Sequence, residues 1–131
     1  RAKAHIKEQQ YGLAVVDLTP ISKEVRTVVG AEAKYELANC YFLLGAIDMA
    51  EQEVMSFMQM QTTQQYWLAK SMILLADINL QRNDSFQAKQ YLLALQANYK
   101  QTDDIQSIVA EKLRALEEKE DTPEIEEEET L

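Results

Sequence analysis

The sequence predicts an all-α protein, built as a right-handed superhelical solenoid of stacked helix-turn-helix repeats. Apolar residues recur at i, i+3, i+4 and i+7 along most of the chain, the spacing of one face of an α-helix. Glycine and proline, which interrupt helices, number only three and two among 131 residues. Two segments also repeat the same small and apolar residues thirty-eight positions apart, Leu37-Ala38…Ala50 and Leu75-Ala76…Ala88. A fixed-period repeat of this kind is the signature of a helical solenoid.

The first four predicted helices are separated by helix-breaking residues. They lie near residues 2–9, 11–25, 31–44 and 46–60. Pro20 should kink or end the second helix, because proline lacks a backbone donor. Gly30 marks the break before the third helix, and Gly45 supplies the left-handed turn that follows it.

Three further helices are predicted near residues 65–82, 84–99 and 102–119. Thr62 or Thr63 is a candidate cap for the first of them. Asn83 occupies the same position in its repeat as Gly45 and is suited to a left-handed turn. Asp84 and Gln87 form a capping-box pattern at the start of the next helix. The last helix has a single apolar stripe, typical of the helix that closes the end of a solenoid. Its members are Ile105, Ile108, Val109, Leu113 and Leu116.

The charge of the chain lies mostly at its C-terminal end. The net charge is −9, of which residues 117–131 contribute −8 and residues 1–116 only −1. We expect residues 120–131 to form an acidic disordered tail, because such a charged run buries nothing. No basic stripe suits a phosphate backbone, so nucleic acid is not an expected partner. No apolar run approaches the roughly 20 residues that span a bilayer, so no membrane insertion is expected.

The repeated segments resemble tetratricopeptide repeats. In the unit at 31–61, Leu37-Ala38 match the helix-A pair, Gly45 the turn and Ala50 the small helix-B position. The unit at 65–99 matches at Leu75-Ala76 and Ala88 but departs from the pattern at Asn79, Asn83 and Ser85. The resemblance implies a repeat domain over residues 1–119, with a truncated repeat at 1–29 and a capping helix at 102–119. The chain begins within a helical pattern and without methionine, so we expect it to be a fragment.

The repeat spacing departs from that of regular tetratricopeptide repeats. Ala14 and Ala50 are 36 residues apart and Ala50 and Ala88 are 38 apart, and both spacings exceed the family norm of 34. They favour the irregular bacterial repeats of periplasmic or envelope proteins, while the cytoplasm stays open.

The resemblance also implies a ligand groove lined by fixed positions of each A helix. Carried over, the partner-binding residues are Glu32, Tyr35, Glu36, Asn39, Phe42, Leu43, Lys70, Ile73, Asp77, Leu80 and Gln81, with Leu74 beside them. The family's carboxylate clamp is absent, because Tyr35, Glu36, Ile73 and Leu74 occupy its lysine and arginine positions. An alternative interpretation is that Tyr35, Ile73 and Leu74 are simply core residues.

Catalytic chemistry has few candidates in this sequence. His5 is the only histidine and Cys40 the only cysteine, and Cys40 falls in the helical core pattern. Glycine-rich phosphate motifs and metal-ligand clusters are absent from the sequence, so we expect no catalytic residue, no metal and no cofactor.

Three functional hypotheses follow, of which the first is preferred. The chain is a protein-protein interaction scaffold that binds a peptide or helical segment of a partner in a concave groove. Alternatively, it is a structural segment of a longer solenoid that mediates assembly, with homo-oligomers forming through exposed N-terminal helices over Tyr11–Ile21. An enzyme would depend on His5 or Cys40.

Overall fold

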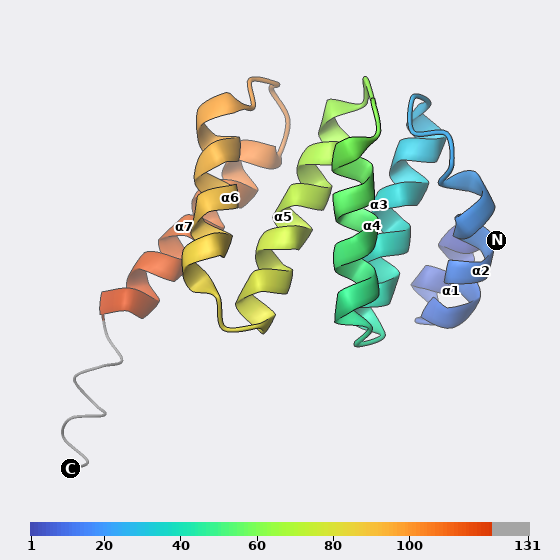
Figure 1. Cartoon of the computed structure of the whole chain (residues 1–131), viewed down its shortest axis with the longest axis horizontal. Coiled ribbons are helices and arrows are strands. Elements are labelled where there is room, and N and C mark those ends of the chain that lie inside the picture. Colours follow the sequence, from blue (N-terminus) through green and yellow to red (C-terminus); the bar gives the residue numbers. More distant parts are fainter. Residues whose placement is uncertain (122–131) are drawn as a thin grey trace, which may run out of the picture.

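The computed structural model describes residues 1–121, and this range consists of α-helices joined by loops, without a β-strand. Its helices are α1 (Ala2–Lys7), α2 (Tyr11–Ile21), α3 (Val28–Leu43), α4 (Ile47–Gln59), α5 (Gln65–Gln81), α6 (Ser85–Asn98) and α7 (Ile105–Asp121). Figure 1 shows them in a row, with α1 and α2 at one end and α7 at the other. The prediction of an all-α protein is confirmed.

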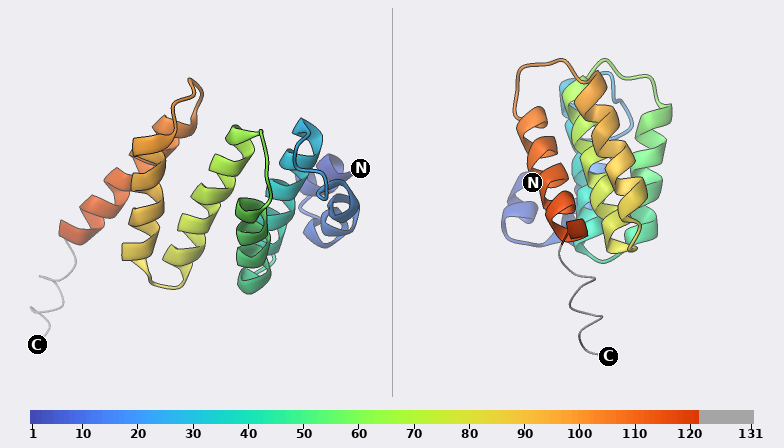
Figure 2. Two further views of the ribbon diagram at one scale, coloured as in Figure 1. Left: turned by 45° about the horizontal axis from the view of Figure 1, so that its top comes forward. Right: turned by 90° about the vertical axis from the view of Figure 1, so that its left-hand side faces the viewer.

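Each helix packs against its neighbours in the sequence, and α5 also packs against α3 and α7. Contacts join every consecutive pair from α1 to α7, and two further sets join α3 to α5 and α5 to α7. Figures 1 and 2 show α4 and α6 on one side of the row and α3 and α7 on the other. Helices α3, α5 and α7 therefore form one continuous face of the molecule.

Two sharp turns between helices adopt the left-handed conformation that their residues predict. Gly45, after α3, has φ +82°, and Asn83, after α5, has φ 61°. Asp84 then caps α6, since its side chain accepts a hydrogen bond from the backbone N–H of Gln87 at 3.1 Å. These three assignments are confirmed.

The predicted break at Gly30 is wrong. Helix α3 begins at Val28, so Gly30 lies within its first turn. Thr27 is the N-cap, and its hydroxyl accepts the N–H of Gly30 at 3.0 Å. Glycine is needed here for close approach, because a Cβ at this position would lie 1.8 Å from the carbonyl oxygen of Glu24.

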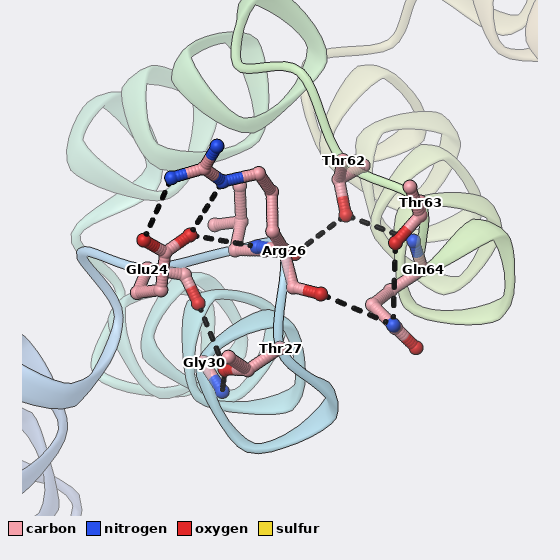
Figure 3. Close-up of polar contacts among 8 residues, drawn as sticks. Glu24, Arg26, Thr27, Gly30, Thr62, Thr63 and Gln64 are labelled. Atoms are coloured by element: carbon pink, nitrogen blue, oxygen red, sulfur yellow. Dashed lines mark hydrogen bonds and ion pairs between the residues drawn. The ribbon is translucent and has the colours of Figure 1, made fainter.

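The loops before α3 and α5 are bonded to each other, as Figure 3 shows. Thr62 donates a hydrogen bond to the carbonyl oxygen of Val25 at 2.6 Å and accepts one from the N–H of Gln64 at 3.0 Å. The side chain of Gln64 donates to the carbonyl of Arg26 at 3.2 Å. The N-cap of α5 is Gln64, without a side-chain cap, so the expected capping role of Thr62 or Thr63 is wrong.

The C-terminal helix is longer at its far end than the sequence suggested. It runs to Asp121, so Glu120 and Asp121 are helical and do not belong to the expected disordered tail. The remainder of that tail, residues 122–131, lies outside the described residues. The predicted apolar stripe packs inward, with Ile105, Val109, Leu113 and Leu116 buried and Ile108 half-buried.

The apolar core is a succession of clusters along the row. One joins α1, α2 and α3, the next joins α3, α4 and α5, and the largest joins α5, α6 and α7. Small residues lie where the helices approach most closely, and Ala38, Ala50, Ala76 and Ala88 are at most 1% exposed. No helix within residues 1–121 is both long and apolar enough to cross a membrane.

Candidate binding groove between α3, α5 and α7

A hollow of about 210 Å³ lies on the face formed by the odd-numbered helices, and we call it the α3–α5–α7 groove. Helix α3 contributes Tyr35, Asn39, Phe42 and Leu43; α5 contributes Lys70, Ile73, Leu74 and Asp77; α7 contributes Ile108 and Lys112. The groove exists because three helices running in the same direction lie side by side, and their side chains leave a gap between the ridges.

The floor of the groove is apolar and belongs to the core. Ile73 and Leu74 are buried, while Tyr35 and Phe42 are half-buried and pack against the cluster that joins α3, α4 and α5. Their burial therefore agrees with the alternative interpretation, in which these residues are core, for Ile73 and Leu74 but not for the half-buried Tyr35. All three still line the hollow, so core packing and groove lining coexist in the same side chains.

The groove carries an ammonium group above an aromatic ring. The Nζ of Lys70 lies 5.5 Å from the centroid of the Tyr35 ring, which is a cation–π distance. Tyr35 in turn packs on Trp67 with 5.7 Å between ring centroids. Among residues 1–121, Lys70 has no ion pair. Burial, with the nearby carboxylates of Glu36 and Asp77, raises the pKa of the Tyr35 phenol to about 12, so the hydroxyl stays protonated at neutral pH.

Polar groups also lie along the rest of the groove. The Nζ of Lys112 donates to Oδ1 of Asp77 at 2.9 Å and so links α7 to α5. The side-chain amide of Asn39, which lines the groove from α3, makes no hydrogen bond with the described residues. A neutral amide with its donors and acceptor unused is suited to pair with a peptide backbone.

Two of the predicted groove residues line a different hollow. Glu32 and Glu36 face a second cavity of about 480 Å³ between α1, α2 and α3. Burial raises the pKa of the Glu36 carboxyl, and the Glu32 carboxylate adds to the rise. The separation follows from helix geometry, because Glu32 and Glu36 lie one turn apart on a face of α3 that is rotated by about 90° from the face of Tyr35 and Phe42.

The structure brings neither Leu80 nor Gln81 into the groove. Leu80 is half-buried against the cluster of α5, α6 and α7. Gln81 is exposed at the last residue of α5, one turn beyond Asp77. Seven of the eleven predicted residues thus line the α3–α5–α7 groove: Tyr35, Asn39, Phe42, Leu43, Lys70, Ile73 and Asp77.

The contribution of α7 to the groove was not predicted, because its single apolar stripe indicated only a closing helix. The 34-residue spacing that aligns Val109-Ala110 with Leu75-Ala76 nevertheless also aligns Ile108 with Leu74. That spacing would have identified Ile108. Lys112 lies one residue away from the position equivalent to Asp77, so the spacing alone does not select it.

The two residues that an enzyme would need are engaged in structural contacts. The Nδ1 of His5 lies 2.6 Å from Oδ2 of Asp17, which joins α1 to α2. Cys40 is a buried free cysteine, and burial raises the pKa of its thiol to about 11. Within residues 1–121, no group of three or more His, Cys, Asp or Glu side chains is arranged to hold a metal ion.

Comparison of the chain with models of known protein families, with curated proteins and with solved structures finds no match.

Proposed function

We propose that this chain is a protein-binding module that holds a peptide or helical segment of a partner in the α3–α5–α7 groove. The observation that supports this proposal best is the composition of that groove. It combines an apolar floor of Ile73 and Leu74 with two polar side chains, Lys70, which forms no ion pair within residues 1–121, and Asn39, whose amide forms no hydrogen bond there. An apolar surface with a few polar groups of fixed position is typical of a peptide-binding site.

The proposal also includes the way in which the helices are arranged. The helices form a right-handed solenoid of tetratricopeptide-like repeats, with α3 and α4 as one pair, α5 and α6 as the next, and α7 as the cap. It is supported by the contacts of α3 with α5 and of α5 with α7, since stacking of equivalent helices is what repeats of this class require. The left-handed turns at Gly45 and Asn83, at equivalent places in the two pairs, support it further.

The groove proposal predicts that partner capture depends on Asn39 and Phe42. We expect Asn39→Ala/Phe42→Ala to reduce capture from an extract of the source cells by tenfold or more, the scale of losing a binding hot spot of about 2 kcal/mol. Capture is read by quantitative mass spectrometry. Asn39→Ala alone tests the same surface with little risk to the fold, because this amide forms no hydrogen bond with any residue of the described range 1–121.

A matched control lies on the other side of the row. Phe86→Ala/Asn98→Ala removes the same two residue types from exposed positions of α6. This variant should capture the partner as the unchanged chain does, with the helicity of all variants checked by circular dichroism. Equal capture by the groove variants and the control would contradict the proposal.

Assembly is the second candidate function, favoured by exposed apolar residues on the N-terminal helix pair. Leu13 and Val16 of α2 are 52% and 69% exposed, and Ile21 at its end is 43% exposed. Within residues 1–121, the helix at the opposite end, α7, has its buried apolar residues on one stripe and carries no exposed large apolar residue. The two ends of the row thus differ in the apolar surface that they present.

A further inference from the structure

We propose that the cavity between α1, α2 and α3, which we call the α1–α2–α3 cavity, binds a small zwitterion with an apolar body. An apolar amino acid and a short apolar peptide both have this chemistry. The cavity is separate from the α3–α5–α7 groove, so this site does not depend on the proposed function. Three features of the cavity support the assignment: its size, the opposite charges on its two walls, and the separation of two of those charges.

The α1–α2–α3 cavity has the size and the lining of a small-molecule site. Its volume of about 480 Å³ lies within the range of about 300–1,000 Å³ that is usual for such sites. Leu18 and Ile21 of α2 form the floor, because α1 and α3 both pack against this helix. Apolar side chains of the two walls continue the floor, namely Ala2 and Ile6 from α1, and Val29 and Ala33 from α3.

The two walls of the cavity carry opposite charges. Lys3 and Lys7 are four residues apart and so lie on one face of α1, where Arg1 adds a third cation. Glu32 and Glu36 share a face of α3 for the same reason. Within residues 1–121, one long ion pair joins the two sets, with 3.9 Å between Nζ of Lys3 and Oε2 of Glu32. A ligand between the walls therefore meets ammonium groups on one side and carboxyl groups on the other.

The second pair of opposite charges, Lys7 and Glu36, is not joined. Each lies one helical turn after a member of the Lys3–Glu32 pair, but neither forms an ion pair or a hydrogen bond with any residue of the described range 1–121. Glu36 is half-buried, and burial together with the Glu32 carboxylate raises the pKa of its carboxyl, against the opposing effect of Lys70 and Lys3. A bound ammonium group would offset this rise, because an opposite charge favours the ionised carboxylate.

A zwitterion matches this arrangement better than a ligand with a single charge. Its ammonium group is the expected partner of Glu36 and its carboxylate the expected partner of Lys7, each through a charge-assisted hydrogen bond. Its apolar body lies on Leu18 and Ile21, where burial of aliphatic surface is favourable. A purely cationic ligand would bring no partner to Lys7, and a purely anionic one would bring none to Glu36.

Titration of leucine and of dileucine into the isotopically labelled full chain tests the inference, with binding followed by NMR chemical shifts. We expect saturable shift changes at the backbone amides of Ile6, Val29 and Glu36. Tighter binding of leucine would identify a free amino acid as the ligand, and tighter binding of dileucine a short peptide. N-acetyl-dileucine and dileucine amide each lack one charge, and each should bind about tenfold more weakly, the scale of losing one charge-assisted hydrogen bond.

Substitutions on the two walls test the role of each charge. Glu36→Gln and Lys7→Gln should each weaken dileucine binding about tenfold, because each removes one charged partner of the ligand. Glu36→Gln should not weaken the binding of N-acetyl-dileucine further, since that ligand has no ammonium group to lose a partner. Glu8→Gln and Lys100→Gln are the matched controls, because both residues are exposed and lie outside the cavity, and they should leave binding unchanged.

Four results would overturn the inference. They are the absence of saturable shifts with both leucine and dileucine, equal binding of dileucine and its two blocked forms, affinities insensitive to Glu36→Gln and Lys7→Gln, and shifts at Asn39 and Lys112 in place of Ile6 and Val29. The last result would place the ligand in the α3–α5–α7 groove. The proposed function is tested separately, by partner capture with the Asn39 and Phe42 variants, so either proposal can fail while the other holds.

Discussion

Gly30 is the residue at which the backbone has least room for a side chain. A Cβ there would lie 1.8 Å from the Glu24 carbonyl oxygen and 2.9 Å from the Thr27 hydroxyl that caps α3. We expect Gly30→Ala to lower the free energy of unfolding by about 2–3 kcal/mol, as overpacking against backbone does. Urea denaturation followed by circular dichroism measures the loss.

Gly12 provides the comparison for Gly30. It also lies in the first turn of a helix, but nothing stands within 4 Å of its Cβ position. Gly12→Ala should therefore leave stability unchanged or raise it by up to about 1 kcal/mol, because alanine is the better helix former. A loss at Gly12 equal to that at Gly30 would show that close approach is not the cause.

The sequence revealed residue roles that depend on the local backbone, but not those that depend on distant contacts. Gly45 and Asn83 were predicted correctly, since both are residue types that tolerate left-handed turns. Gly30 was misjudged, because its reason is the carbonyl of Glu24, which a helical pattern does not show. Lys112 was missed because its position in the groove depends on its ion pair with Asp77, thirty-five residues earlier, and a helical pattern does not show such a contact either.

At the scale of elements, the loops before α3 and α5 hold two helix pairs together. Thr62 bonds to the Val25 carbonyl and to the N–H of Gln64, as Figure 3 shows. We expect Thr62→Val to lower the free energy of unfolding by about 1–2 kcal/mol, because the Val25 carbonyl loses its donor. Thermal or urea unfolding measures the change.

The adjacent threonine is the control for that prediction. Thr63 is exposed, and its side chain takes part only in a 3.5 Å contact with the Gln64 amide. Thr63→Val should change stability by less than about 0.5 kcal/mol. Similar losses for Thr62 and Thr63 would argue against the loop bond as the cause.

The periodicity of the apolar residues predicted which segments form helices, but it did not predict the residues at which each helix begins and ends. Every predicted helix is present, because amphipathic spacing over ten or more residues has no other simple explanation. Helix α3 nevertheless begins three residues earlier than expected, since the cap is Thr27 and not a residue beside Gly30. Seven predicted groove residues line the hollow because groove positions recur with the helix repeat. Glu36 instead faces the hollow between α1, α2 and α3, and Leu80 packs against the cluster of α5, α6 and α7, and both placements depend on contacts with neighbouring helices.

At the scale of the whole molecule, the exposed apolar residues of α2 predict self-association. If the N-terminal end of the row is an assembly surface, the average mass measured by light scattering should rise with protein concentration. Val16→Asp should restore the mass of a monomer, because a carboxylate is costly to bury in an apolar contact. Met58→Asp, on α4, is the control and should leave the association unchanged. A monomer mass for the unchanged chain at all concentrations would remove assembly as a function.

The burial of Cys40 has a consequence for the surroundings in which this protein can work. Oxidants, disulfide partners and soft metals react with a thiolate, and with a pKa of about 11 only about one thiol in ten thousand is ionised at pH 7. The sulfur is also enclosed by the cluster that joins α1, α2 and α3. As long as the helices stay together, the Cys40 thiol therefore has the same covalent state under oxidising and under reducing conditions. A change of redox surroundings does not act on the fold through this cysteine.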